Sequence, residues 1–403
     1  MNALLTAGEA TEMLGINRAT LYAYVSRGLI RSEEGDSKKR TRLYHAEDIE
    51  RLRQRKEQRR DPDKAAEDTL NWGTPVVESA LTRIADGRLY YRGRDAVALA
   101  GSRSIEEVAS LLWTGSFDRW DPLGTRLTLP DRFWTLREQL ARSKPYDLLR
   151  ILLPFAAPLD RAAVDLRPEA VASTGRRIVR TMVAVLTGKP LADRGISATL
   201  AAFWAPNIPQ ASRLINSALV LCADHELNTS SFTARCVAST CADPYGVVEA
   251  GLAALSGYRH GGMTELVEDL FIDCEGKNEG EMKSILYERL RRGERLPGFG
   301  HTLYPDGDPR GRHLLTAIGN ASPVATAIAS AALDVTGDRP NLDFGLVATA
   351  RALKAPAGSA LVLFALGRTF GWIGHAIEEY ERGRLIRPRA RYVGPAGIAG
   401  PDR

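Results

Sequence analysis

The sequence predicts an all-α protein, and three observations lead to that class. Ala- and Leu-rich segments recur at intervals of about 10 to 20 residues as far as residue 383, and Gly or Pro ends them. These segments lack the buried β-pattern of a parallel sheet. The chain also contains no P-loop or GxGxxG signature. We therefore expect a helical body without a nucleotide-binding βαβ unit.

The composition is that of a globular protein with a large core. The chain has 403 residues, of which 44% are hydrophobic, which is enough for two or three domains. Its apolar stretch 360–377 is interrupted by Arg368 and His375, so no membrane span is expected. Residues 1–14 include Glu9 and Glu12 and do not resemble an export signal. We expect a cytoplasmic location.

The four cysteines and the charge distribution narrow the class further. The cysteines form no CxxC pair, so we expect buried, reduced thiols and no metal site. Residues 1–60 hold thirteen Lys or Arg and nine Asp or Glu, a balance of +4, whereas the whole chain is +5. This local excess suggests a polyanionic partner for the N-terminus, and the near-neutral remainder suggests small-molecule chemistry.

The first sixty residues open with a helix, a tight turn and a second helix. Thr6 can cap the first helix, whose Ala10, Met13 and Leu14 share one face, and Gly15 permits the turn. The second helix begins at Asn17 or Arg18. Its inward face is expected to hold Leu21, Tyr22 and Val25, and its outward face to offer phosphate or base contacts from Arg18, Thr20, Tyr24 and Arg27.

A basic hairpin and a third helix complete this module. The segment 29–44 carries Lys38, Lys39, Arg40 and Arg42 near a turn at 35–37, and a helix follows from Ala46 with Ile49 and Leu52 inward. The pattern resembles the winged helix-turn-helix of mercury-resistance-type regulators and phage excisionases, which implies binding to duplex DNA. The alternative is a charged helical cap that binds nothing.

Two short segments separate this module from the helical body. Asp61, Pro62 and Asp63 break the third helix, and the polar stretch that follows predicts a linker at 61–74. At 87–95, the sequence GRLYYRGRD places β-formers between glycines and predicts a small hairpin.

Six histidines are the first candidates for chemistry. His45, His313 and His375 have no distinctive neighbours in sequence and are expected to be structural. The other three lie in polar or Gly-rich segment ends, where side chains can converge on a ligand: His225, His260 and His301. Each has a structural alternative, since His225 can pair with Asp224 at a helix cap and a helix-end histidine can bind terminal carbonyls. Asp343 likewise suits a helix N-cap.

Six motifs occur in order along the chain: DHELNTSSFTAR, HGG, PGFGHxxY…DPR, NLDFG, GRTFGWIGH and RPRARYVG. Together they resemble the citrate synthase family over about residues 70 to 400. The resemblance implies an all-helical homodimer with a large and a small domain, here preceded by the winged helix-turn-helix domain at 1–60. The expected body spans 75–403, with a large subdomain at 75–260 and 346–403 and a small one at 261–345.

The resemblance assigns the roles of individual residues. It makes Asp343 the base that removes a methyl proton from an acyl-CoA, His260 the donor to the enolate oxygen and His301 the donor to the ketone oxygen of a 2-oxo acid. Substrate-binding groups are expected at His225, Arg310, Arg368 and Arg387, the last from the neighbouring subunit. The adenine of CoA is expected on the backbone of Leu296, Pro297, Gly298, Phe299 and Gly300.

The implied activity joins acetyl-CoA to oxaloacetate, with acetyl-CoA as co-substrate and no permanently bound cofactor. Propionyl-CoA, the substrate of 2-methylcitrate synthases, differs by one methylene and stays open. The residues flanking HGG, Tyr258 and Arg259 before it and Met263 and Thr264 after it, depart from the family pattern and leave acyl selectivity open. The segment after His301 also departs from the family pattern, with Tyr304-Pro305-Asp306-Gly307 where many members carry a basic residue near the phosphates of CoA. The residues that contact these phosphates therefore stay open. A DNA-binding regulator that senses metabolites is the alternative from another class.

Overall fold

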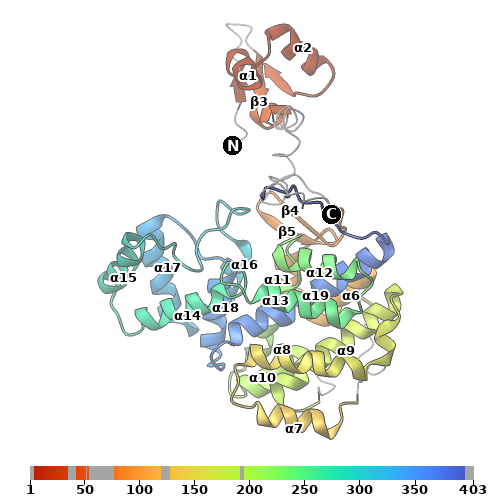
Figure 1. Cartoon of the computed structure of the whole chain (residues 1–403). Helices are drawn as coiled ribbons and strands as arrows, with labels where there is room; N and C mark the ends of the chain where they lie inside the picture. The colour runs from red at the N-terminus through yellow and green to blue at the C-terminus, as the bar shows by residue number, and fades with distance from the viewer. Residues whose placement is uncertain are drawn as a thin grey trace, which may run out of the picture. The chain divides into compact units, whose positions relative to one another are not determined.

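The computed structural model describes residues 4–34, 42–50, 52–53, 77–118, 128–190 and 195–394. The chain divides into two compact units, Met1–Glu78 and Ser79–Arg403 (Figure 1). The predicted linker at 61–74 lies outside the described residues.

The N-terminal unit is a winged helix-turn-helix. It consists of β1 (Leu4–Thr6), α1 (Ala7–Leu14), α2 (Arg18–Ser26), β2 (Ser32–Glu34) and β3 (Arg42–His45), and residues 46–50 are helical. The strands form an antiparallel sheet in the order β1-β3-β2. Thr6 and Glu9 form a capping box at the start of α1, and Gly15 ends the helix in the left-handed conformation. The predicted cap and turn are confirmed.

Three side chains of this unit, those of Met13, Tyr22 and Tyr24, lie on a different face from the one predicted. Met13 is 40% exposed and Tyr22 is 52% exposed, whereas the core of this unit holds Ala10, Leu14 and Leu21. Tyr24, expected to point outward, packs against that core. The inward stripe follows the i, i+3, i+4 spacing of Leu21, Tyr24 and Val25, and Met13 and Tyr22 lie beside the stripes of their helices.

The second unit begins with a small sheet. β4 (Thr82–Ala85), β5 (Arg88–Tyr91) and β6 (Arg94–Asp95) pair antiparallel in chain order. The predicted hairpin at 87–95 is the β5–β6 part, and β4 extends it to three strands.

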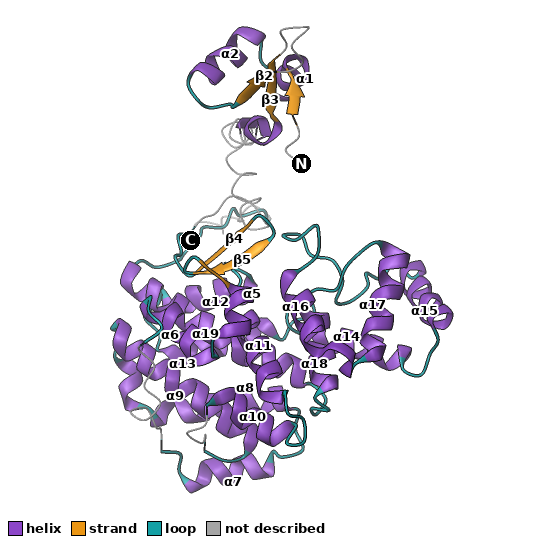
Figure 2. Cartoon of the chain, turned by 180° about the vertical axis from the view of Figure 1, so that it is seen from behind, coloured by secondary structure: helices purple, strands orange, loops and turns teal. Residues whose placement is uncertain are grey.

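The remainder of this unit is helical, which confirms the all-α class (Figure 2). Its α-helices are α5 (Ala96–Ser102), α6 (Ile105–Thr114), α7 (Asp131–Gln139), α8 (Pro145–Ala156), α9 (Pro168–Thr187), α10 (Ile196–Trp204), α11 (Ala211–Cys222), α12 (Thr229–Ala238), α13 (Pro244–Leu255), α14 (Met263–Cys274), α15 (Glu279–Arg291), α16 (Pro309–Ile318), α17 (Pro323–Thr336), α18 (Leu342–Ala352) and α19 (Ser359–Arg382). Short 3-10 turns lie at η1 (Ala157–Leu159), η2 (Arg161–Val164) and η3 (Gly319–Ala321).

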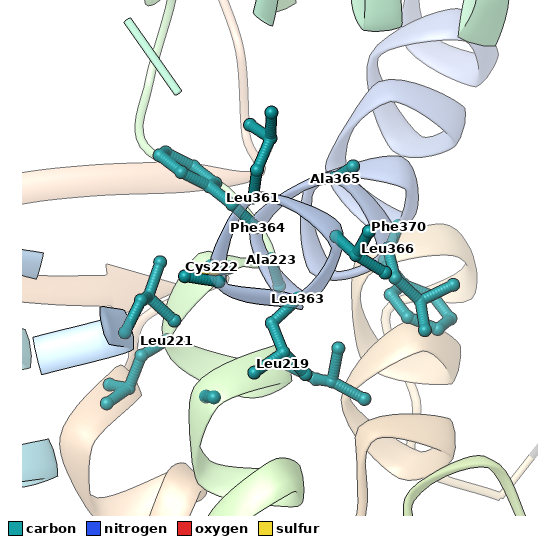
Figure 3. Packing of buried hydrophobic residues seen from close by; sticks show 14 of the residues in the cluster. Leu219, Leu221, Cys222, Ala223, Leu361, Leu363, Phe364, Ala365, Leu366 and Phe370 are labelled. Carbon is teal, nitrogen blue, oxygen red and sulfur yellow. The ribbon is translucent and has the colours of Figure 1, made fainter. Parts of the chain in front are cut away.

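Helix α19 is the centre of the core. It packs against α9, α11, α12 and α13, and Figure 3 shows the apolar side chains of α11 and α19 in contact. At Gly371 a Cβ would lie only 2.2 Å from the carbonyl oxygen of Ala223, so glycine lets the two backbones approach. Among the described residues α19 is the one helix long and apolar enough to cross a membrane, and its apolar window is entirely buried in the protein.

Helices α14 to α18 form a lobe of their own beside the rest of the unit, as both views show (Figures 1 and 2). Within it α15 packs on α17, and α16 packs on α18. Helix α18 also packs on α19, which joins the lobe to the core. The expected subdomain boundary at residue 345 falls inside α18, which is continuous from Leu342 to Ala352. The subdomain bounds stay a prediction.

The cysteines are all free, but they are not all buried. Cys222 and Cys274 are buried, Cys236 is half-buried and Cys241 is exposed. The expectation of four buried thiols is therefore wrong for Cys236 and Cys241. Cys241 is exposed because it lies in the turn after α12 and does not pack into the core.

Candidate active site

A loop and a helix start are joined at the centre of the site. The loop at 296–300 precedes His301, and residues 339–341 precede α18. The amide of Asn341 donates to the carbonyl of Gly298 at 2.9 Å, and that of Gly300 donates to the carbonyl of Arg339 at 3.0 Å. The side-chain amide of Asn341 reaches the carbonyl of Gly300 at 3.1 Å. His301 and the first turn of α18 are thus held by one junction.

Asp343 lies in that first turn of α18. Asn341 caps the helix by accepting from the amide of Asp343 at 3.0 Å. The carboxyl Oδ1 of Asp343 is shielded from solvent and has no hydrogen-bond partner among the described residues. Burial raises the pKa of Asp343 to about 7, helped by Asp308 and opposed by Arg310 and Arg368. The capping role considered for Asp343 belongs to Asn341, which leaves this carboxyl available as a base.

His260 lies in the tight turn between α13 and α14. Its Nε2 is 2.8 Å from the hydroxyl of Ser230, which also accepts from the indole of Trp372 at 3.3 Å. Ser230 is in turn 2.8 Å from Oδ1 of Asn228. Burial, and then the charge of Arg368, lower the pKa of His260 to about 3. The imidazole is therefore neutral at pH 7, and one of its nitrogens is a donor.

His225 and His301 lie together around Tyr304. The two imidazole ring centres are 5.2 Å apart, and Nε2 of His225 is 3.0 Å from the hydroxyl of Tyr304. Nδ1 of His301 accepts from the amide of Leu303 at 3.1 Å, so the hydrogen of the neutral ring is on Nε2. Burial lowers the pKa of His301 to about 4 and that of His225 well below its usual range, with Arg310 adding to both shifts.

Two buried arginines supply positive charge to the same region. Arg310 forms a two-point ion pair with Asp308, at 2.9 and 2.8 Å. The carboxylate of Asp308 also accepts from the amide of Leu342 at 3.1 Å, which ties the arginine to the start of α18. Arg368 donates from Nε to the carbonyl of Cys222 at 2.8 Å, while one of its terminal nitrogens is buried without a partner among the described residues.

The other predicted binding residues lie apart from this cluster or at its edge. Arg387 follows α19 and is exposed. In the predicted CoA loop Leu296, Pro297 and Gly298 are buried, while Phe299 and Gly300 are half-buried. A Cβ at Gly298, whose φ is +83°, would lie 2.8 Å from the side chain of Val267, so the loop packs closely on α14. The roles of Arg387 and of this loop stay predictions.

Sequence reasoning missed three residues that the structure brings to the site. Ser230, Asp308 and Tyr304 stand inside the motifs DHELNTSSFTAR, DPR and PGFGHxxY, so their positions were available as a signal, whereas their contacts were not. His375, expected to be structural, is buried among polar partners. Its Nε2 lies 3.1 Å from Oδ1 of Asp224, and its Nδ1 lies 3.3 Å from Arg235. Asp224 therefore binds His375 and does not cap with His225.

The predicted DNA-contacting residues are partly described. Arg18, Arg27 and Arg42 are exposed, and Thr20 is half-buried with its hydroxyl 2.9 Å from Oδ1 of Asn17. Tyr24 is packed against the core of the N-terminal unit. Lys38, Lys39 and Arg40 lie outside the described residues. In the described part of the chain no group of three or more His, Cys, Asp or Glu side chains is placed to hold a metal ion.

Comparison with known proteins identifies the two parts of the chain. Residues 69–389 match the family model described as citrate synthase, C-terminal domain, and residues 4–57 match a helix-turn-helix domain. The chain therefore belongs to the citrate synthase family. It is a citrate-synthase-type enzyme that carries a helix-turn-helix domain at its N-terminus.

Individual relatives agree with this assignment. The chain is 32% identical over 358 residues to the citrate synthase of Haloferax volcanii, covering 80% of this chain and 94% of that protein. It is 28% identical over 359 residues to the citrate/2-methylcitrate synthase of Bacillus subtilis, covering 80% and 96%. The structure of citrate synthase from Thermotoga maritima superimposes with a TM-score of 0.68 at 25% identity, covering 81% of this chain and 96% of that one.

Proposed function

We propose that the protein condenses acetyl-CoA with oxaloacetate and water to give citrate and CoA. The observation that carries the proposal is the shielded carboxyl of Asp343, whose Oδ1 is without a partner and whose pKa is raised to about 7. A thioester methyl is a very weak acid, so its proton is removed only if the enolate oxygen is stabilised as it forms. His260 is the proposed donor, with the hydroxyl of Ser230 turned to donate to Nε2, so that the one hydrogen of the neutral imidazole is on Nδ1 and can reach the enolate oxygen.

The second half of the reaction falls to His301. The enolate carbon attacks the ketone of the oxo acid, and the ketone oxygen becomes negative. Because Nδ1 of His301 already accepts from the amide of Leu303, its Nε2 carries the hydrogen that this oxygen needs. Hydrolysis of the resulting citryl thioester then releases CoA and makes the overall reaction favourable.

The two carboxylates of oxaloacetate need fixed cations, and the proposed set is Arg310, Arg368 and, from a neighbouring subunit, Arg387. The unpartnered nitrogen of Arg368 supports its part, since a buried N–H without an acceptor gains most from an anionic ligand. His225 is proposed as a further hydrogen-bond donor to the oxo acid. The backbone of residues 296–300 is the proposed binding site for the adenine of CoA.

Thiol release from acyl-CoA tests the activity directly. The assay uses oxaloacetate with acetyl-, propionyl- and longer CoA esters. His301→Ala and Asp343→Ala should each abolish release, whereas His313→Ala, which alters a half-buried histidine on α16, should leave it unchanged. Absence of turnover with every acyl-CoA and 2-oxo acid would refute the proposed activity.

The second candidate is 2-methylcitrate synthesis from propionyl-CoA. A Bacillus subtilis relative carries both activities in its name, and one methylene changes discrimination in an apolar pocket by only about 1 to 3 kcal/mol. The ratio of kcat/KM for acetyl-CoA and propionyl-CoA in the same assay decides between the two, and a ratio above one favours citrate.

The homodimer is tested by complementation. An Arg387→Ala chain and an Asp343→Asn chain should both be inactive. If Arg387 acts in the site of its neighbour, a heterodimer of the two contains one intact site. Random re-pairing of equal amounts makes half of the dimers mixed, so activity should return to about a quarter of the native value. No return of activity would contradict a shared site.

For the N-terminal unit we propose binding to duplex DNA through the exposed Arg18, Arg27 and Arg42, together with Lys38, Lys39 and Arg40. Affinity should fall steeply with salt and fall further when the wing residues are neutralised. Arg292→Gln, an exposed arginine at the end of α15, is the matched control. The chain would then act in the cytoplasm as an enzyme that binds DNA. If DNA binds but no substrate turns over, a metabolite-sensing regulator becomes the better interpretation.

A further inference from the structure

Tyr304 lies at the meeting point of three site residues to which the proposed reaction assigns roles. Its amide donates to the carbonyl of His301 at 3.0 Å, so the two residues close one turn of the loop. Its side chain is 2% exposed. The ring is 4.9 Å from that of His301 and 5.7 Å from that of His225, measured between ring centres. The guanidinium of Arg310 lies 5.4 Å from the ring centre.

The hydroxyl of Tyr304 has one described partner, Nε2 of His225, at 3.0 Å. Two directions of this hydrogen bond are conceivable for a neutral imidazole, because either the phenol or the ring nitrogen can donate. A phenol is a good donor and a weak acceptor, and an imidazole nitrogen with a lone pair is a good acceptor. The guanidinium of Arg310 beside the ring strengthens the phenol as a donor and opposes a positive charge on His225.

The favoured direction therefore runs from the phenol to the imidazole. Nε2 of His225 then carries the lone pair, and its single ring hydrogen is on Nδ1. A 2-oxo dicarboxylate offers only acceptors, in its carboxylates and its ketone, so a neutral residue can bind it only through a donor. In the opposite tautomer, the one N–H of His225 would donate to Tyr304 and could not donate to the substrate.

We infer that Tyr304 is a positioning residue for the 2-oxo acid, which fixes His225 in the tautomer with its hydrogen on Nδ1 and so keeps that histidine a donor to the substrate. This role rests on the proposed function, in which His225 binds the oxo acid. Under this inference, the hydroxyl of Tyr304, the last residue of the motif PGFGHTLY, contributes to substrate binding as well as to packing.

Packing alone is the competing explanation, and Tyr304→Phe separates the two, because it keeps the ring against His301 and Arg310 and removes only the hydroxyl. The control is Tyr245→Phe, which removes another buried tyrosyl hydroxyl, 3.1 Å from Asp160 and outside this cluster. We expect Tyr304→Phe to raise KM for oxaloacetate about tenfold, with KM for acetyl-CoA unchanged and kcat within about threefold. Tyr245→Phe should leave both KM values unchanged.

The tautomer itself is read by NMR of protein labelled with ¹⁵N-histidine, with His225→Gln identifying the signals of His225. In the native protein one nitrogen of His225 should show the shift of an unprotonated acceptor and the other that of an N–H. In Tyr304→Phe the two shifts should move toward each other as the tautomers mix. Identical His225 shifts in the two proteins, or an equal rise of both KM values, would overturn the inference.

Direct titration of oxaloacetate by calorimetry keeps this test separate from the proposed reaction. If the native protein does not bind oxaloacetate, the proposed function fails. If the native protein binds it and Tyr304→Phe binds it equally well, the proposed function stands and the role of Tyr304 is refuted.

Discussion

Nε2 of His260 lies 2.8 Å from the hydroxyl of Ser230, which the indole of Trp372 also reaches at 3.3 Å. Ser230 therefore orients the histidine that stabilises the enolate in the proposed reaction. Ser230→Ala should lower kcat about a hundredfold and change KM for oxaloacetate little, because an electrostatic donor that is misplaced loses transition-state stabilisation. Ser217→Ala, which removes a buried hydroxyl bonded to the carbonyl of Ala100, should leave kcat unchanged. Equal effects of the two changes would show that Ser230 only stabilises the fold.

The pH dependence of activity should follow Asp343. Its pKa is raised to about 7 by burial, and a base acts only when ionised. The rate at low substrate should therefore fall about tenfold for each pH unit below 7 and level off above it. His260 and His301, with pKa values lowered to about 3 and about 4, stay neutral over this range and add no further limb. A rate that is flat between pH 5.5 and 9 would contradict the assignment of Asp343 as the base.

The same carboxyl should make stability depend on pH. Its folded-state pKa of about 7 is above the ordinary aspartic acid value of 3.8, so the folded protein holds the proton more tightly than the unfolded chain. Stability should then fall as pH rises from about 4 to about 7. Asp343→Asn removes the charge and should be inactive but more stable, with its advantage growing by about 2.6 kcal/mol between pH 5 and pH 8. Denaturant unfolding at both pH values measures this. An advantage that does not change with pH would mean that Asp343 titrates normally in the folded state.

Two ion pairs with the same sequence spacing should differ sharply in how much they contribute to the free energy of unfolding. Asp308 and Arg310 are buried, with 0% and 3% of their side chains exposed, whereas Asp165 and Arg167 are 33% and 82% exposed. Asp308→Asn leaves a buried guanidinium without its counter-charge and should cost about 3 kcal/mol of unfolding free energy. Asp165→Asn should leave the unfolding free energy nearly unchanged, because water screens that pair. Denaturant midpoints compare the two variants, and a similar loss in both would refute the special role of burial.

Local chemistry explains what could be predicted from the sequence. Thr6 caps α1 and Gly15 ends it, because a cap and a left-handed turn depend on a few adjacent residues. The all-α class follows from the recurring helical segments, and the family follows from six ordered motifs. These signals are carried by residue identity and short spacing, so no knowledge of the tertiary contacts is needed to recognise them.

Burial and pairing were decided only by the tertiary structure. Tyr22 is exposed and Tyr24 packs inward, the reverse of the prediction. His375, without a distinctive neighbour in sequence, meets Asp224 from a segment 151 positions earlier. The hydrogen bond between Tyr304 and His225 likewise joins distant segments, and the carboxyl of Asp343 is shielded although it has no hydrogen-bond partner at Oδ1 among the described residues. The motifs identify which residues are present at the site, while desolvation and hydrogen-bond direction depend on what the packed chain places around each of them.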